Sequence, residues 1–231
     1  MAKEFDKNMF VMLLAIMIGV IIITFFISDI QRQTQIEDIN IKHVQEIETI
    51  EERNLNFSSM FLDSLISFNK AQDDRMDGEI NYKVATEFYN TIFDETNKTN
   101  FLDFKLTIIN NCIEAQSDFI NSGSNFNDSI YNFEDSKKET DYELYHGLCD
   151  LYVNLSTVGY NLSDLSYSVS MYLRYLAENL SFYNGTVGFI KNASELQGLF
   201  NDTLQKYIEL GEEFDYLKEL IEIYDLYVPE R

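Results

Sequence analysis

The sequence predicts an all-α protein: an N-terminal transmembrane helix, then an elongated antiparallel bundle of three to four long helices. Three observations predict this fold. The 231 residues include one proline and nine glycines, so turn-forming residues are scarce. Apolar residues recur at unbroken spacings of three and four over long stretches, which is the period of helices packed lengthwise. Twenty consecutive residues near the N-terminus carry no charge.

The uncharged stretch covers residues 9–28 and is long enough to cross a hydrocarbon core of about 30 Å as a helix. No small-residue cleavage pattern follows it, so we expect an uncleaved signal anchor that contacts membrane lipid. Two lysines precede the stretch and one arginine follows closely, which favours residues 1–8 as a short cytoplasmic N-terminus. Residues 29–231 would then lie outside the cytoplasm, as the domain of a single-pass protein of the cell membrane.

The formal net charge of −22 belongs entirely to this domain. Residues 1–28 hold two lysines against Glu4 and Asp6, so their charges cancel, and residues 29–231 carry the full −22. Such an acidic surface repels the phosphate backbone of nucleic acids, which excludes nucleic acid as an expected partner. We expect a protein partner or a homo-oligomer instead.

The first predicted helix of the bundle spans residues 30 to about 70, without glycine or proline. Its stripe also contains His43 and Asn54, which we interpret as polar inclusions. The apolar members are Ile36, Ile39, Ile47, Ile50, Phe57, Phe61, Leu65 and Phe68. Residues 71–78 are acidic, and we interpret them as a bend or a solvated helical turn. A shorter amphipathic piece with Ile80, Val84, Phe88 and Ile92 follows, and residues 94–100 are predicted to form a loop.

The middle of the chain is predicted to form another helix seam and a brief helix. The seam consists of Leu102, Leu106, Ile109, Ile113 and Ile120. The sequence Ser-Gly-Ser-Asn at residues 122–125 indicates a turn. A brief helix at residues 126–134 comes next, and the polar residues 136–141 form either a loop or the start of the helix that follows.

Two matched seams predict an antiparallel hairpin over residues 141–228. The first rod covers residues 144–183, with the seam Leu144, Leu148, Leu151, Leu155, Val158, Leu162, Leu165, Val169, Tyr172, Leu176, Asn179 and Tyr183. Residues 184–188 contain two glycines and predict the connecting turn. The second seam is Ala193, Leu196, Phe200, Thr203, Tyr207, Leu210, Phe214, Leu217, Ile221, Tyr224 and Val228. The first rod also places Tyr145, Tyr152, Leu173 and Leu180 one step past its seam, and this wide apolar face favours a bundle over a two-stranded coiled coil.

Nine Asn-x-Ser/Thr sequons follow the predicted anchor, where chance would place about three. If the domain faces a compartment that contains the machinery, they are acceptors for glycans, and the domain is a glycoprotein. The glycosylation candidates are Asn56, Asn97, Asn127, Asn154, Asn161, Asn184, Asn192 and Asn201. The ninth, Asn179, lies on the seam, so we predict that it is unmodified and makes a polar contact.

Cys112 and Cys149 are the only cysteines. Their even number in an outward-facing domain allows one disulfide, and buried free thiols are the alternative. A plain hairpin at residues 122–125 or 136–140 would not bring them together, whereas a short crossing helix at 126–134 would.

No motif of catalysis or cofactor binding occurs: the G-x-S-x-G, Walker A, Rossmann and H-E-x-x-H patterns are all missing from the sequence. We therefore expect a non-enzyme with no metal and no cofactor. The expected function is a structural or protein-interaction module at the cell surface. The alternative is a ligand-sensing ectodomain that signals through a membrane partner.

Overall fold

A computed structural model describes the backbone of residues 7–226, and the side chains of residues 17–20 and 23–223. The chain divides into an N-terminal unit, residues 1–53, and a bundle unit, residues 54–231. Four α-helices account for 89% of the structure, which confirms the predicted helical bundle. They are α1 (Lys7–Thr91), α2 (Lys98–Lys138), α3 (Glu143–Glu178) and α4 (Ser194–Leu226).

Within the part of the chain whose side chains are described, no helix is both long and apolar enough to span a membrane. Residues 9–16, 21 and 22 of the predicted anchor lie outside that part. The backbone of the anchor belongs to α1, which passes through residues 71–78 without the bend that the sequence allowed. Ala71 and Gly78 are buried there, so the turn is helical but only partly solvated.

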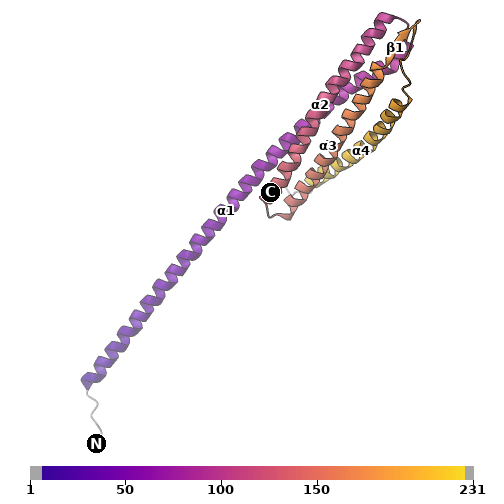
Figure 1. The fold of residues 1–231 in the computed structure, drawn as a ribbon. Helices are drawn as coiled ribbons and strands as arrows, with labels where there is room; N and C mark the ends of the chain where they lie inside the picture. The colour runs from indigo at the N-terminus through magenta and orange to yellow at the C-terminus, as the bar shows by residue number, and fades with distance from the viewer. Residues whose placement is uncertain (1–6, 227–231) are drawn as a thin grey trace. The chain divides into compact units, whose positions relative to one another are not determined.

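In the bundle unit, α2, α3 and α4 lie side by side, and α3 contacts both of the others (Figure 1). The connection from α1 to α2 is a short 3₁₀-helix, Ile92–Asp94, and a loop that is shorter than the predicted loop at residues 94–100, because α2 already begins at Lys98. Asn97 caps α2, because its Oδ1 accepts hydrogen bonds from the backbone N–H groups of Thr99 and Asn100.

The predicted turn at residues 122–125 is wrong: α2 continues through it. The small residues serve close packing instead. The Ser122 hydroxyl is fully buried, donates to the carbonyl of Ala71 in α1 at 2.8 Å and lies 2.9 Å from Ser163 Oγ in α3. A larger side chain at position 122 would push α1, α2 and α3 apart. The small residues at 122–125 are therefore explained by the close approach of these helices and not by a turn.

The α3–α4 connection differs from the all-α prediction, because it is a β-hairpin. β1 (Leu180–Tyr183) pairs antiparallel with β2 (Thr186–Phe189), and α3 therefore ends five residues before the predicted end of the first rod. Asn184 and Gly185 form the two-residue turn, with φ of +51° and +79°. Positive φ at both central residues defines a type I′ turn, which explains the preference for Asn-Gly.

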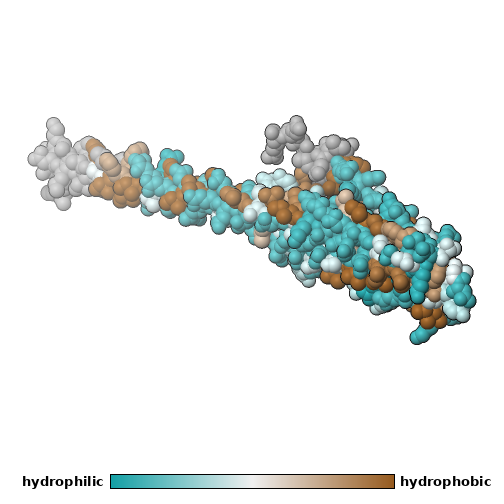
Figure 2. All heavy atoms as spheres, turned by 90° about the horizontal axis from the view of Figure 1, so that it is seen from above, coloured by the Kyte–Doolittle hydropathy of each residue, from teal (hydrophilic) through white to brown (hydrophobic). Residues whose placement is uncertain are grey.

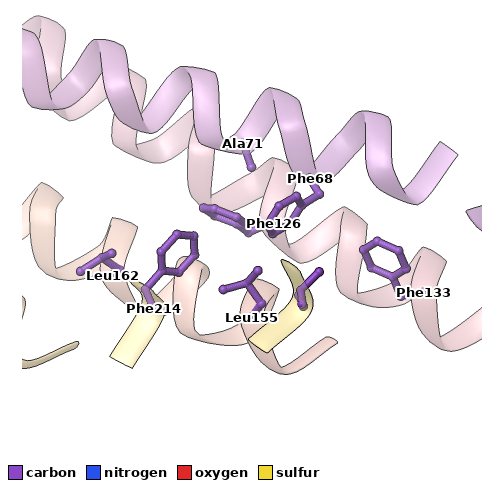
Figure 3. Packing of buried hydrophobic residues seen from close by; sticks show 8 residues of the cluster. Phe68, Ala71, Phe126, Phe133, Leu155, Leu162 and Phe214 are labelled. Atoms are coloured by element: carbon purple, nitrogen blue, oxygen red, sulfur yellow. The ribbon is translucent and has the colours of Figure 1, made fainter. Parts of the chain in front are cut away.

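The hydrophobic core of the bundle unit consists of two clusters. One is built around Phe126, which lies between Phe68 of α1 and Phe214 of α4 (Figure 3). The other, toward the hairpin, includes Ile108, Cys112 and Leu173. In α4 the predicted seam is confirmed from Ala193 to Ile221, since each seam residue is buried or half-buried, while the side chains of Tyr224 and Val228 lie outside the described residues.

Candidate interaction surface

The seam predicted in α2 faces mostly away from the core, and of its five members Ile109 alone packs partly against it. Its members Leu106, Ile113 and Ile120 are 57%, 48% and 59% exposed, and Leu102 is also exposed. The core instead receives a second stripe of the same helix, which contains Phe101, Ile108, Phe119, Phe126 and Phe133. Aromatic rings bury about 150–250 Å² each, so turning the phenylalanine stripe inward removes more apolar surface from water than turning the aliphatic stripe inward.

We call Leu102, Leu106, Ile109, Ile113 and Ile120 the α2 stripe. Four of its members are exposed on the outer side of α2, Ile109 is half-buried at its edge, and uncharged Asn110, Ser117 and Asn121 are among its neighbours. A chain of net charge −22 thus presents a continuous uncharged, apolar line on one helix. Figure 2 shows one face of the molecule, where hydrophobic residues are exposed among mostly hydrophilic ones. An exposed apolar line of this kind marks an interaction surface more often than an isolated exposed leucine does.

A groove between α2 and α3 lies at one end of the α2 stripe. Its volume is about 330 Å³, and its lining includes Ile120 and Gly123 of α2 with Tyr160, Asp164 and Tyr167 of α3. Tyr160 and Tyr167 are seven residues apart and so project from the same side of α3. Neither tyrosine belongs to the predicted seam, and their heptad spacing outside that seam is the sequence signal that indicates them.

Polar contacts fix the register of α2 against α3 along the whole pair. At one end Lys105 Nζ donates to the carbonyls of Glu178 and Leu180, at 2.9 and 2.7 Å. Burial lowers the pKa of Lys105. At the other end Lys137 Nζ donates to Asp150 at 2.6 Å. The α2 stripe and the tyrosines of α3 are therefore held on one face by a fixed pair of helices.

Serines bond the middle of the α2–α3 pair. Ser129 Oγ donates to Ser156 Oγ at 2.8 Å, and both residues are fully buried. Gly159 lies against the ring of Phe126 so closely that a Cβ there would stand 2.6 Å from Cζ. Small residues on α3 thus allow the large rings of α2 to enter the core, and this packing determines which side of α2 faces outward.

A second groove, of about 380 Å³, lies between α1 and α4 of the bundle unit. Arg75 Nη1 donates to Glu79 Oε1 at 2.5 Å, and the guanidinium lies 4.9 Å from the centre of the Phe214 ring. The Tyr207 hydroxyl donates to the same Glu79 oxygen at 3.0 Å. Burial, followed by the neighbouring Glu79 charge, raises the pKa of Tyr207. These contacts join α1 to α4, and they leave Arg75 Nε buried without a hydrogen-bond partner among the described residues.

The possible disulfide between Cys112 and Cys149 is not formed: both thiols are free and buried. Their helices explain the separation. Ser122 meets Ser163 and Ser129 meets Ser156, so antiparallel pairing places Cys112 near Leu173 and Cys149 near Ser136. Cys112 and Ser136 are 24 residues apart on α2, or roughly 36 Å at 1.5 Å per residue. Burial raises the pKa of Cys112 to about 12 and that of Cys149 to about 11.

The sequon asparagines lie mostly on the surface. Asn127 is half-buried, and the other seven candidates are exposed: Asn56, Asn97, Asn154, Asn161, Asn184, Asn192 and Asn201. Three sequons end in serines that the core uses, namely Ser129, Ser156 and Ser163. Helix packing therefore accounts for the serine of these three sequons without any glycan. Glycosylation stays a prediction at all eight candidates.

Asn179 makes the polar contact that the sequence predicted, although at the end of α3 and not inside a helix seam. Its Nδ2 donates to the carbonyl of Lys191 at 3.1 Å, and its Oδ1 accepts from the Lys191 backbone N–H at 3.2 Å. The Asn179 carbonyl also accepts from the N–H of Ile190 at 2.8 Å. This asparagine ties the two ends of the hairpin together, and a glycan on Nδ2 would remove one of these bonds.

The histidines have ordinary structural surroundings. His146 is in the first turn of α3, and its Nε2 lies 2.6 Å from the carbonyl oxygen of Thr140, which belongs to the connection between α2 and α3. His43 Nδ1 lies 3.4 Å from Glu46 Oε2 on the exposed surface of α1.

In comparisons with known proteins, no protein-family model, no curated protein and no solved structure matches this chain. The functional proposal therefore rests on the surface chemistry of the chain itself.

Proposed function

We propose that this chain is a membrane-anchored protein whose acidic helical bundle lies outside the cytoplasm and acts as a structural or protein-interaction module at the cell surface. The anchor is the uncharged segment of residues 9–28, whose length suits a bilayer. The lysines before it favour a cytoplasmic N-terminus. The density of sequons beyond it supports the same orientation.

The observation that carries the interaction role is the exposure of the α2 stripe on a bundle of strongly acidic composition. Its proposed occupant is an amphipathic helix of a partner protein, apolar along its centre and basic at its rim. The apolar centre matches Leu106 and Ile113, and the basic rim matches Asp164 in the adjoining groove. A second copy of this acidic chain would bring like charges together at that rim.

A photo-crosslinking amino acid at position 113, in intact cells, tests this role. Ile66 of α1 is a matched control, because it is an equally large side chain, 58% exposed against 48% for Ile113. We expect one discrete crosslinked partner from position 113 and none from position 66. The substitution Leu106→Glu should abolish that crosslink, and Ile66→Glu should leave it unchanged.

Equal crosslinking from the two positions would contradict a specific surface on α2. A crosslinked product that contains only two copies of this chain would replace the partner protein by self-association. Protease protection in intact cells tests the topology separately: we expect residues 29–231 to be digested from outside, and their protection would overturn the extracytoplasmic location.

The alternative function is a ligand-sensing ectodomain that signals through a membrane partner. The groove at Tyr160 and Tyr167 favours it, because its volume of about 330 Å³ falls at the lower end of the range of small-molecule sites, about 300–1,000 Å³. A stoichiometric partner with a cytoplasmic output domain, copurified in mild detergent, would support sensing, whereas a surface polymer as partner would support the structural role.

A further inference from the structure

Residues 29–53 of α1 pose a physical problem as a single helix. Every residue from 23 to 52 is exposed, so this part of the helix has no apolar packing to support it. Nine of the 24 residues from 29 to 52 are β-branched, which lowers helix propensity. Isolated helices in water are marginal even with better formers, and most helices depend on packing of an apolar face. The segment therefore requires a partner for its apolar face.

The segment has a heptad seam for such a partner. The d positions of the heptad are Asp29, Ile36, His43 and Ile50, and the a positions are Gln33, Asn40 and Ile47, so the apolar part of the seam runs from Ile36 to Ile50. Ile36, Ile47 and Ile50 are each 52–56% exposed. The outermost f positions are polar throughout: Asp38, Gln45 and Glu52. The contrast between the seam and the f positions is the pattern of a coiled coil.

Asn40, one of the polar members of the seam, indicates the partner. An asparagine in a seam position needs a hydrogen-bonding group opposite, and the asparagine side chain is both donor and acceptor. In a parallel, in-register pair, Asn40 faces Asn40 of a second copy and satisfies it. In the antiparallel register that overlaps most, Asn40 faces His43 and Ile36 faces Ile47, but Ile50 then faces the polar Gln33. The parallel register instead pairs every seam isoleucine with the same isoleucine of the second copy. Asparagine at such a position is known to specify register and a two-stranded state.

The flanking positions favour the same arrangement. In a parallel pair, Arg32 at position g lies beside Glu37 at position e of the other copy, and Ile39 lies beside Val44. Glu46 and Glu51 are the one like-charged pair of this set. Within its own chain, however, Glu46 lies 3.4 Å from His43, on the same helix face. One attractive and one apolar contact thus oppose one repulsive contact.

We propose that residues 29–53 form a parallel, in-register coiled coil with a second copy of this chain, so that the protein is a homodimer. Figure 2 shows the exposed apolar residues along this helix. The proposal goes beyond the function proposed above and does not rest on it, because it uses only the exposed surface and the heptad positions of residues 29–53.

Disulfide trapping in the full-length chain tests register and orientation together. Single cysteines are placed at seam positions, Ile36→Cys or Ile50→Cys, and at matched outer positions, Asp38→Cys or Glu52→Cys. Cysteines whose Cβ atoms come within about 4 Å can join, which a parallel seam allows and outer positions do not. We expect covalent dimers from the seam variants under mild oxidation and at least tenfold less from the outer variants. The unsubstituted chain, with its buried native thiols, is the background control.

A second test measures the mass of the particle in solution and compares substitutions at two isoleucines of identical exposure. Ile47 and Ile41 are both 56% exposed, but Ile47 lies in the seam and Ile41 at the outer b position. In detergent, sedimentation should show a dimer for the unchanged chain and for Ile41→Lys, and a monomer for Ile47→Lys. Circular dichroism confirms that each variant keeps the helices of the bundle unit.

Three results would overturn the proposal. Crosslinking that occurs only in a mixture of the Ile36→Cys and Ile47→Cys chains would show an antiparallel pair, because an antiparallel coil places position d opposite position a. A monomeric or higher-order mass for the unchanged chain would exclude the dimer. Equal loss of dimer in Ile41→Lys and Ile47→Lys would show that the seam does not hold the two copies together.

Discussion

Gly159 offers the most direct test of how α2 and α3 pack, through the substitution Gly159→Ala. In an exposed helix interior, alanine in place of glycine stabilises by about 1 kcal/mol through helix propensity. At position 159 the added Cβ would stand 2.6–2.8 Å from three carbons of the Phe126 ring, well inside ordinary contact. The Phe126 ring cannot move away from the added Cβ without disturbing its neighbours, because it is fully buried and packs edge-on against Phe68 and Phe214. The ring centroids of these two residues lie 5.6 and 6.1 Å from that of Phe126 (Figure 3).

Overpacking of a core by one methyl group typically costs about 1–3 kcal/mol, and more where a ring and the backbone must move together. Because the added Cβ meets three ring carbons at 2.6–2.8 Å, we expect a cost in the upper part of this range, about 2–3 kcal/mol. Subtracting the propensity gain of about 1 kcal/mol leaves a decrease of about 1–2 kcal/mol in the free energy of unfolding for Gly159→Ala. For a chain of this size, about 2–4 °C of melting temperature corresponds to each kcal/mol, so the expected loss is roughly 2–8 °C.

Gly198 of α4 is the matched control, since a Cβ there meets nothing within 4 Å. Gly198→Ala should therefore raise the melting temperature by roughly 1–4 °C through helix propensity alone. Thermal unfolding of the detergent-solubilised chain, followed by circular dichroism at 222 nm, measures both variants. If Gly159→Ala proved as stable as Gly198→Ala, the close contact between α3 and Phe126 would be wrong.

Three further predictions concern polar and titratable groups of the bundle unit. Tyr207→Phe removes the hydrogen bond to the half-exposed Glu79, and we expect a loss of about 0.5–1.5 kcal/mol in denaturant unfolding; an unchanged midpoint would mean that the bond adds nothing. Asn179→Ala removes two bonds to the hairpin and should cost about 1–2 kcal/mol, while glycopeptide mass spectrometry of native material should find Asn179 unmodified. Cys112 and Cys149 should resist alkylation at pH 8 in the folded chain and react after unfolding. Folding raises the pKa values of the two thiols to about 12 and 11, so the contribution of the protonated thiols to stability is complete below about pH 9 and is lost as the pH rises through 11–12. Rapid alkylation of the folded chain would contradict the burial of these thiols.

The two stripes of α2 show where periodicity stops being informative. Leu106 and Ile113 belong to a regular aliphatic stripe, and Phe119 and Phe126 belong to another on the same helix. Both stripes predict a helix, and the sequence analysis took the aliphatic one as the seam. The neighbouring helices decide which stripe is buried, because only they supply small residues, such as Gly159, into which a ring can pack. A helix pattern by itself contains no information on its neighbours.

The segment at residues 122–125 illustrates the same limit for turns. Glycine and serine indicate a turn in isolation, because they tolerate unusual backbone angles. Here they are helical, and Ser122 bonds to α1 and lies against Ser163 of α3. By contrast, Asn184-Gly185 is a true turn, since both residues have positive φ. The difference lies in whether neighbouring helices need a small side chain, which the local sequence does not show.

The sequence by itself determined that the chain is helical, where α4 places its seam, and that connections lie within residues 94–100 and 184–188, whereas it left residues 136–141 open between a loop and the start of α3. These features depend on local chemistry: helix periodicity, capping and turn preference act over a few residues. Only the tertiary structure decided that Cys112 and Cys149 stay apart, that Asn179 ties the hairpin, and that the α2 stripe faces outward. Those outcomes depend on which surfaces meet, and packing between segments far apart in the chain is what chooses among equally periodic faces.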